Sequence, residues 1–127
     1  MAKISILVDT DIFIDYFNTG LFSNILENDE FIIYYSMVTK KELISKKGLK
    51  TSERIAVLHT LKNYRLINID STIAAKYSSL RKKYPNLDKE DILIASTALV
   101  KRLPLLTRNW KHYKNIEGLV LFIGERK

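Results

Sequence analysis

The chain has 127 residues, of which 46% are hydrophobic and 28% are charged, and it contains no cysteine. This composition is typical of a globular protein with one buried core; it excludes disulfides and thiolate metal sites and argues against long disordered linkers. The 21 Lys and Arg residues outnumber the 14 Asp and Glu residues, and the net charge of +7 favours a polyanionic partner such as nucleic acid.

The apolar run at 4–8 is too short for a signal peptide or a membrane span. We therefore expect a soluble, cytoplasmic protein with no membrane partner. The sequence has no internal repeat, low-complexity segment or domain boundary, so residues 1–127 are predicted to form a single domain.

Strands and helices are predicted to alternate along the chain. The first half is predicted to contain a buried strand at 4–8, helices at 12–17 and 21–28, a strand at 31–35 and a helix from 36 towards 47. The second half is predicted to contain helices at 51–61, 71–80 and 89–102 and strands at 66–69, 105–107 and 119–122. Asp11, Ser36 and Asp88 are the predicted N-caps of three of these helices. The alternation predicts an α/β sandwich around a mainly parallel sheet.

Two acidic residues follow the first predicted strand. Ligands of open α/β sheets bind beyond the carboxyl ends of the strands, and Asp9 stands immediately after the run at 4–8. Asp11 lies in the same turn, where it can cap a helix, bind a metal ion, or do both. Asp9 is therefore the stronger candidate for chemistry.

Asp91 opens the helix predicted at 89–102. It precedes Ile94, Ala95 and Ala98 by three, four and seven residues, which places its carboxylate at the head of an apolar helix face. A charge at that position needs a partner, and a cation is the obvious candidate. The alternative is a capping box formed by residues 88–91.

Glu42 is ambiguous from its position alone. It lies in a lysine-rich predicted helix, where a salt bridge with Lys46 explains it as well as a catalytic role does.

A cluster of such carboxylates is costly without a cation. Two like charges at ~4 Å and an effective dielectric near 20 repel by about 4 kcal/mol. Mg²⁺ prefers oxygen ligands and shares its coordination sphere with phosphate oxygens, and it can activate water for phosphodiester hydrolysis. Only two histidines are present, so a zinc site is disfavoured.

Five segments in order resemble the PIN-domain family, and in particular the VapC-type ribonuclease toxins of prokaryotic toxin–antitoxin pairs. The segments are 8–15, 36–43, 91–99, 105–110 and 116–119. The resemblance implies a PIN-like three-layer sandwich with a central sheet of four to five strands. It also implies a Mg²⁺-dependent endoribonuclease, with Mn²⁺ as a substitute, that cleaves single-stranded or looped RNA.

The resemblance also assigns site residues. Asp9, Glu42 and Asp91 become the metal-binding acids, which resolves the ambiguity at Glu42. Thr107, together with Thr10, would orient ligands or waters through its hydroxyl. Asn109 would lie at the metal site or hold a carboxylate in place.

Two positions depart from the family pattern. Asp11 stands where relatives often carry Asn or Ser, and we include it among the metal ligands. His112 stands where relatives commonly carry an acid, so one Mg²⁺ ion is better supported than two. His112 itself is either a surface histidine or a contact to the scissile phosphate.

Substrate and partner surfaces are less sharply indicated. Basic residues that could follow an RNA backbone are Lys40, Lys41, Lys46, Lys47, Arg108, Lys111 and Lys114. Trp110 either stacks on an unpaired base or packs a helical turn, and packing is preferred for Tyr113. The apolar surplus at 13–26 is either core or a groove for an antitoxin, and the resemblance further implies a toxin homodimer.

Two rival functions are compatible with parts of the sequence. A catalytically weak or inactive PIN-like domain would bind RNA or a protein partner without cleavage, and His112 supports it. A phospho-acceptor receiver domain built on Asp70 would leave Glu42 and Asp91 unexplained.

Overall fold

The computed structural model describes residues 2–123. Its strands are β1 (Ile4–Val8), β2 (Phe31–Ser36), β3 (Arg65–Ile67) and β4 (Leu105–Leu106). Its helices are α1 (Thr10–Thr19), α2 (Ser23–Leu26), α3 (Met37–Ile44), α4 (Thr51–Leu61), α5 (Ser71–Lys83), α6 (Lys89–Lys101) and α7 (Trp110–Tyr113). No helix within this part of the chain is both long and apolar enough to cross a membrane.

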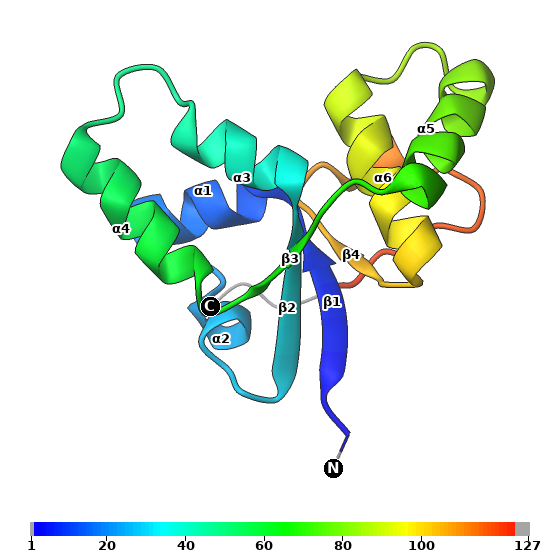
Figure 1. The fold of residues 1–127 in the computed structure, drawn as a ribbon. Coiled ribbons are helices and arrows are strands. Elements are labelled where there is room, and N and C mark those ends of the chain that lie inside the picture. Colours follow the sequence, from blue (N-terminus) through cyan, green and yellow to red (C-terminus); the bar gives the residue numbers. More distant parts are fainter. Residues whose placement is uncertain (1, 124–127) are drawn as a thin grey trace.

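The four strands form one parallel sheet in the order β3-β2-β1-β4. Figure 1 shows α1 to α4 on one face of this sheet and α5 and α6 on the other. The predicted α/β sandwich with three layers is therefore confirmed. The strand predicted at 119–122 is wrong as a strand, because this segment contributes only an isolated parallel bridge between Leu121 and Leu105.

Strand β1 lies between the two cores. Ile6 and Val8 pack with α1, α2 and α4, whereas Leu7 packs with α5 and α6, and all three side chains are fully buried. Successive side chains of a strand point to opposite faces, so a continuous apolar run is required wherever helices cover both sides. The same burial fixes where β1 ends and where Asp9 projects.

The helix that follows β1 begins earlier than predicted. Asp9 has extended backbone and its carboxylate accepts a hydrogen bond from the Thr10 N–H at 2.8 Å, so Asp9 is the N-cap. The prediction that Asp11 caps this helix is wrong, because Asp11 lies in the first turn of α1. Ser36 caps α3 as predicted, accepting from the Val38 and Thr39 N–H groups.

Candidate active site

Asp9 is the buried centre of the site. Its side chain lies at the carboxyl end of β1, and the residue is 4% exposed. Oδ2 accepts hydrogen bonds from the Thr107 hydroxyl at 2.8 Å and the Tyr113 hydroxyl at 3.3 Å. Burial, with a smaller contribution from the Asp11 charge, raises the pKa of Asp9 to about 7. The surroundings of Asp9 therefore disfavour the ionised form of its carboxyl group.

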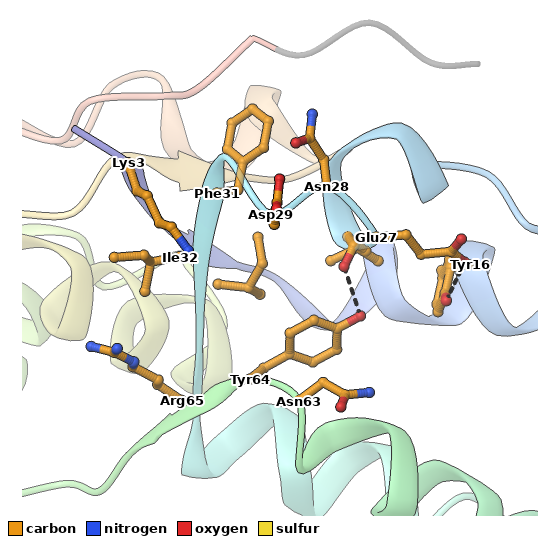
Figure 2. A pocket seen from close by; sticks show the side chains of 12 residues that line it. Lys3, Tyr16, Glu27, Asn28, Asp29, Phe31, Ile32, Asn63, Tyr64 and Arg65 are labelled. Carbon is orange, nitrogen blue, oxygen red and sulfur yellow. Dashed lines mark hydrogen bonds between the residues drawn. The ribbon is translucent and has the colours of Figure 1, made fainter. Parts of the chain in front are cut away.

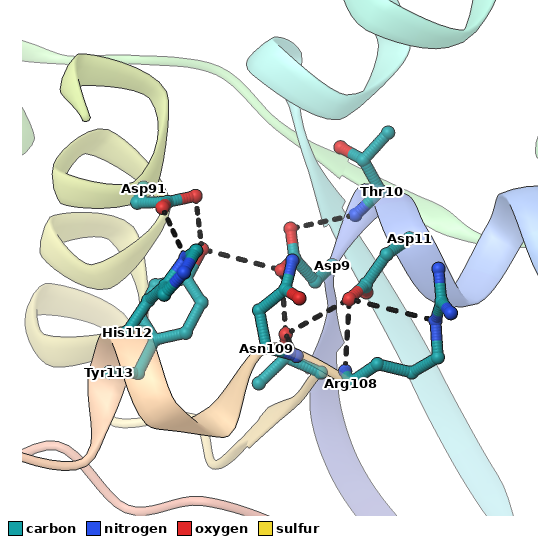
Figure 3. Close-up of polar contacts among 9 residues, drawn as sticks. Asp9, Thr10, Asp11, Asp91, Arg108, Asn109, His112 and Tyr113 are labelled. Carbon is teal, nitrogen blue, oxygen red and sulfur yellow. Dashed lines mark hydrogen bonds and ion pairs between the residues drawn. The ribbon is translucent and has the colours of Figure 1, made fainter. Parts of the chain in front are cut away.

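Asp91 approaches Asp9 from α6, which covers the face of the sheet opposite α1 and α3. It lies in the first turn of α6, and its Oδ1 accepts a hydrogen bond from the Tyr113 hydroxyl at 3.0 Å. Figure 3 shows the Tyr113 hydroxyl between the two aspartates, and the tyrosine is fully buried. Burial and the charges of Asp9 and Asp91 raise the pKa of Tyr113, so the phenol remains a proton donor.

His112 also contacts Asp91. Its Nδ1 lies 3.2 Å from Asp91 Oδ2, while the histidine side chain remains more than half exposed. Both options for this residue, surface histidine and phosphate contact, are compatible with that position. What the structure adds is a pairing with one of the predicted metal-binding acids.

Glu42 reaches the site from α3. The Thr10 hydroxyl donates a hydrogen bond to Glu42 Oε1 at 2.7 Å and lies 2.9 Å from the hydroxyl of Thr39, which is fully buried. Partial loss of water around the carboxylate raises the pKa of Glu42, although the Thr10 hydrogen bond opposes this. The charges of Glu90, Asp91 and Asp11 raise it further, so two of the other predicted acids lie close enough to act on Glu42.

Asp11 connects α1 to the loop after β4. Its Oδ2 accepts a hydrogen bond from the Arg108 N–H at 3.0 Å, and the Arg108 guanidinium pairs with Asp15 at 2.9 Å. Oδ1 is buried and has no hydrogen-bond partner among the described residues. Burial raises the pKa of Asp11 in spite of Arg108. One oxygen therefore has a structural role, whereas the other is buried without such a contact.

Thr107 and Asn109 complete the carboxyl edge of the sheet. Thr107 holds Asp9, and its own Oγ1 accepts a hydrogen bond from the Asn109 N–H at 3.0 Å. Asn109 is the residue that precedes α7, and its side chain is exposed at the site in Figure 3. The Thr107 hydroxyl, predicted to orient ligands or waters, donates to the Asp9 carboxylate, whereas its role in catalysis and that of the Asn109 carboxamide stay predictions.

The donor set is compatible with Mg²⁺. No three His, Asp or Glu side chains within residues 2–123 form a preformed metal cluster, but Mg²⁺ is usually held by one or two carboxylates and keeps several waters. Oxygens of Asp9 and Asp91 flank a single hydroxyl, and the buried Oδ1 of Asp11 lacks a partner. A bound cation would also favour the ionised carboxylates and so lower the raised pKa values of Asp9, Asp11 and Glu42.

A pocket at the opposite edge of the sheet is not part of this site. It has a volume of about 420 Å³, and Lys3, Phe31 and Arg65 line it near the amino ends of β1, β2 and β3 (Figure 2). Its polar contacts include hydrogen bonds from the Tyr16 hydroxyl to Glu27 at 2.6 Å and from the Tyr64 hydroxyl to the Leu26 carbonyl at 3.1 Å. Ligand chemistry in parallel α/β sheets occurs at the carboxyl edge, so the acidic site is the better candidate.

Tyr113 and Thr39 are the site residues that sequence reasoning missed. The sequence favoured simple packing for Tyr113, and the ring is indeed buried, but its hydroxyl contacts two acids. A buried phenol needs a polar partner, and that need was the available signal.

Asp70, the acceptor required by a receiver domain, instead caps α5 through the Ile73 N–H at 2.9 Å.

Comparison with known proteins identifies the class. The fold and site define a parallel α/β domain with acids gathered at the carboxyl edge of its sheet, and a model of the PIN domain matches residues 6–118. The chain belongs to the PIN-domain family, as the resemblance predicted.

Individual proteins similar to this chain include a ribonuclease and chains of toxin–antitoxin complexes. The chain is 32% identical over 126 residues to Ribonuclease VapC1 of Methanocaldococcus jannaschii, covering 95% of this chain and 88% of that protein. A chain of a toxin–antitoxin complex from Klebsiella pneumoniae is 31% identical with a TM-score of 0.74, over 91% of this chain and 95% of that one. VapBC2 from Rickettsia felis, bound to a promoter DNA fragment, gives a TM-score of 0.82 at 23% identity over 96% and 100% of the two chains, which supports the fold alone.

Proposed function

We propose that this chain is a Mg²⁺-dependent endoribonuclease that hydrolyses phosphodiester bonds in single-stranded or looped RNA. The observation that carries the proposal is the convergence of Asp9, Glu42 and Asp91 from β1, α3 and α6. The 32% identity to a protein named a ribonuclease supports the same activity.

Three acids would hold the ion, with Asp11 Oδ1 as a further donor and Mn²⁺ as a substitute metal. When bound, Mg²⁺ would neutralise charge on the phosphodiester and activate water for attack. The protein orients these acids through neighbouring hydroxyls: Thr107 and Tyr113 donate to Asp9, and Thr10 donates to Glu42.

We further propose that the protein is the toxin of a toxin–antitoxin pair and acts in the cytoplasm as a homodimer. The similarity to a chain of the Klebsiella pneumoniae toxin–antitoxin complex supports an antitoxin partner. Of the apolar surplus at 13–26, Phe13, Phe22, Ile25 and Leu26 are buried in the core, so an antitoxin would have to use the half-buried side chains between them. A monomer without partners in sedimentation would contradict this part of the proposal.

RNA cleavage tests the activity. The purified chain is incubated with labelled single-stranded RNA in Mg²⁺, Mn²⁺ or EDTA, and wild type is compared with Asp91→Asn. Asp88→Asn is the matched control, because Asp88 lies at the start of the same helix, is exposed, and makes no capping hydrogen bond through its side chain. We expect cleavage by wild type and Asp88→Asn in either metal, and none with EDTA or Asp91→Asn.

The alternative function is a PIN-like domain that binds RNA without cutting it. The pairing of His112 with Asp91 favours it, because a protonated histidine would compete with a cation for that carboxylate. RNA binding without cleavage in any divalent metal would establish this alternative and contradict the nuclease.

A further inference from the structure

A second hollow lies beside the acidic site. It has a volume of about 650 Å³, and Thr107, Arg108 and Trp110 contribute to its wall. Thr107 belongs to both places, since its hydroxyl donates to Asp9 at 2.8 Å. A group bound in the hollow would therefore lie next to the carboxylates.

The hollow combines aromatic walls with positive charge. Phe22, Phe122 and Trp110 line it, and Trp110 is 50% exposed. The ammonium groups of Lys111 and Lys114 lie 6.0 and 5.7 Å from the centre of the Trp110 ring. Aromatic surface flanked by cations suits a flat aromatic group carried on an anionic backbone.

The backbone of Phe22 supports a specialised role for this wall. Phe22 has φ 68° and ψ 11°, in the left-handed region that bulky residues rarely adopt. Phe22 is buried, with 3% of the residue exposed, and it lines the hollow. Strained conformations of this kind persist where packing holds them, and they concentrate at ligand sites.

We propose that this hollow, which we call the base pocket, binds one unstacked nucleobase of single-stranded RNA beside the scissile phosphate. Unpaired bases stack on aromatic side chains, whereas a duplex keeps its bases in the helix. The base pocket would thus select single-stranded substrate and influence where the chain cuts. This inference rests on the proposed ribonuclease function, but its test does not require cleavage.

Trp110 provides a direct signal, because it is the only tryptophan in the chain. Wild-type protein in EDTA is titrated with a short single-stranded RNA and with an abasic chain of the same length and charge. We expect saturable quenching of tryptophan fluorescence by the RNA and little by the abasic chain, since only the RNA has bases to stack. Equal quenching by both, or by neither, would overturn the base pocket and leave the hollow to another occupant.

Substitutions separate stacking from charge. Removing a stacking ring costs about 1–3 kcal/mol per base, so Trp110→Ala should weaken RNA binding roughly 5- to 150-fold by fluorescence polarisation, while Trp110→Phe stays within a few-fold of wild type. Ile55→Ala, on the 62% exposed Ile55 of α4, is the control and should bind as wild type does. Circular dichroism melting checks that each variant is folded. Unchanged binding by Trp110→Ala would refute the proposal.

The two proposals fail in different ways. Selective quenching without cleavage would keep the base pocket and remove the nuclease. Cleavage at identical sites by wild type and Trp110→Ala, together with equal quenching by both chains, would keep the nuclease and remove the base pocket.

Discussion

Metal-free protein should lose stability as the pH rises, and Asp9 should be the main cause. The pKa of Asp9 is raised from 3.8 to about 7 in the folded protein. The folded state therefore keeps a proton that the unfolded chain releases between these values, so stability present at low pH is lost as the pH rises towards 7. The free energy of unfolding should fall by about 1.4 kcal/mol for each pH unit in this range. Between pH 5 and pH 7 the loss is therefore about 3 kcal/mol.

Urea unfolding in EDTA at pH 5 and pH 8 measures this loss. Asp9→Asn keeps the size of the side chain and removes its charge, so its free energy of unfolding should fall less than that of wild type by about 3 kcal/mol. Some decline should remain in the variant, because the pKa values of Asp11 and Glu42 are raised as well. Asp29→Asn, at an exposed acid near the opposite edge of the sheet, is the control.

Mg²⁺ should reduce the loss in wild type at pH 8, because an ion that binds only the folded state stabilises it. An equal decline in wild type and Asp9→Asn, or a gain in wild-type stability from pH 5 to pH 8, would refute the assignment of Asp9 as a buried acid with a raised pKa.

Three further outcomes follow from the hydroxyls and cations around the site. Tyr113→Phe keeps the buried ring and removes the bond to two carboxylates, so kcat for RNA cleavage should fall with little change in KM, at a stability cost of about 1 kcal/mol in thermal melting. Thr10→Val should likewise lower kcat, because Glu42 loses its 2.7 Å hydrogen bond, and restoration of the rate by Thr10→Ser would exclude a packing effect. The double variant of Lys111→Gln and Lys114→Gln should weaken the salt dependence of RNA binding. The slope of log K against log salt concentration should become less steep by roughly 0.7 for each lysine–phosphate contact that is lost. An unchanged slope would show that neither lysine binds the RNA backbone.

The features predicted correctly from sequence depend on local patterns. The buried strand β1 is a continuous apolar run, so its end and the position of Asp9 follow directly. The spacing of Asp91 from the small residues of α6 likewise predicted a carboxylate turned towards neighbours rather than solvent. Glu42 could not be placed in this way, because its partner Thr10 is 32 residues away.

The features that were missed depend on tertiary contacts. Asp9 is the N-cap of α1, so Asp11 lies in the first turn of the helix. There its Oδ2 accepts a hydrogen bond from the Arg108 N–H, which is 97 residues away in the sequence. Tyr113 meets Asp9 and Asp91 only because α7 folds beneath them, which no local pattern encodes. The segment at 119–122 has the apolar composition of a strand, but it makes a single bridge at the edge of the sheet.

Binding of Mn²⁺, measured by isothermal titration calorimetry, tests whether the acids form one divalent-cation site. Wild type and the exposed-acid control Asp88→Asn should bind the ion with the same affinity. Asp91→Asn and Glu42→Gln should each bind about tenfold more weakly or worse, because Mg²⁺-type ions depend on the few carboxylates that hold them. Equal affinity in all four proteins would contradict a metal site built from these acids, and with it the proposed mechanism of RNA cleavage.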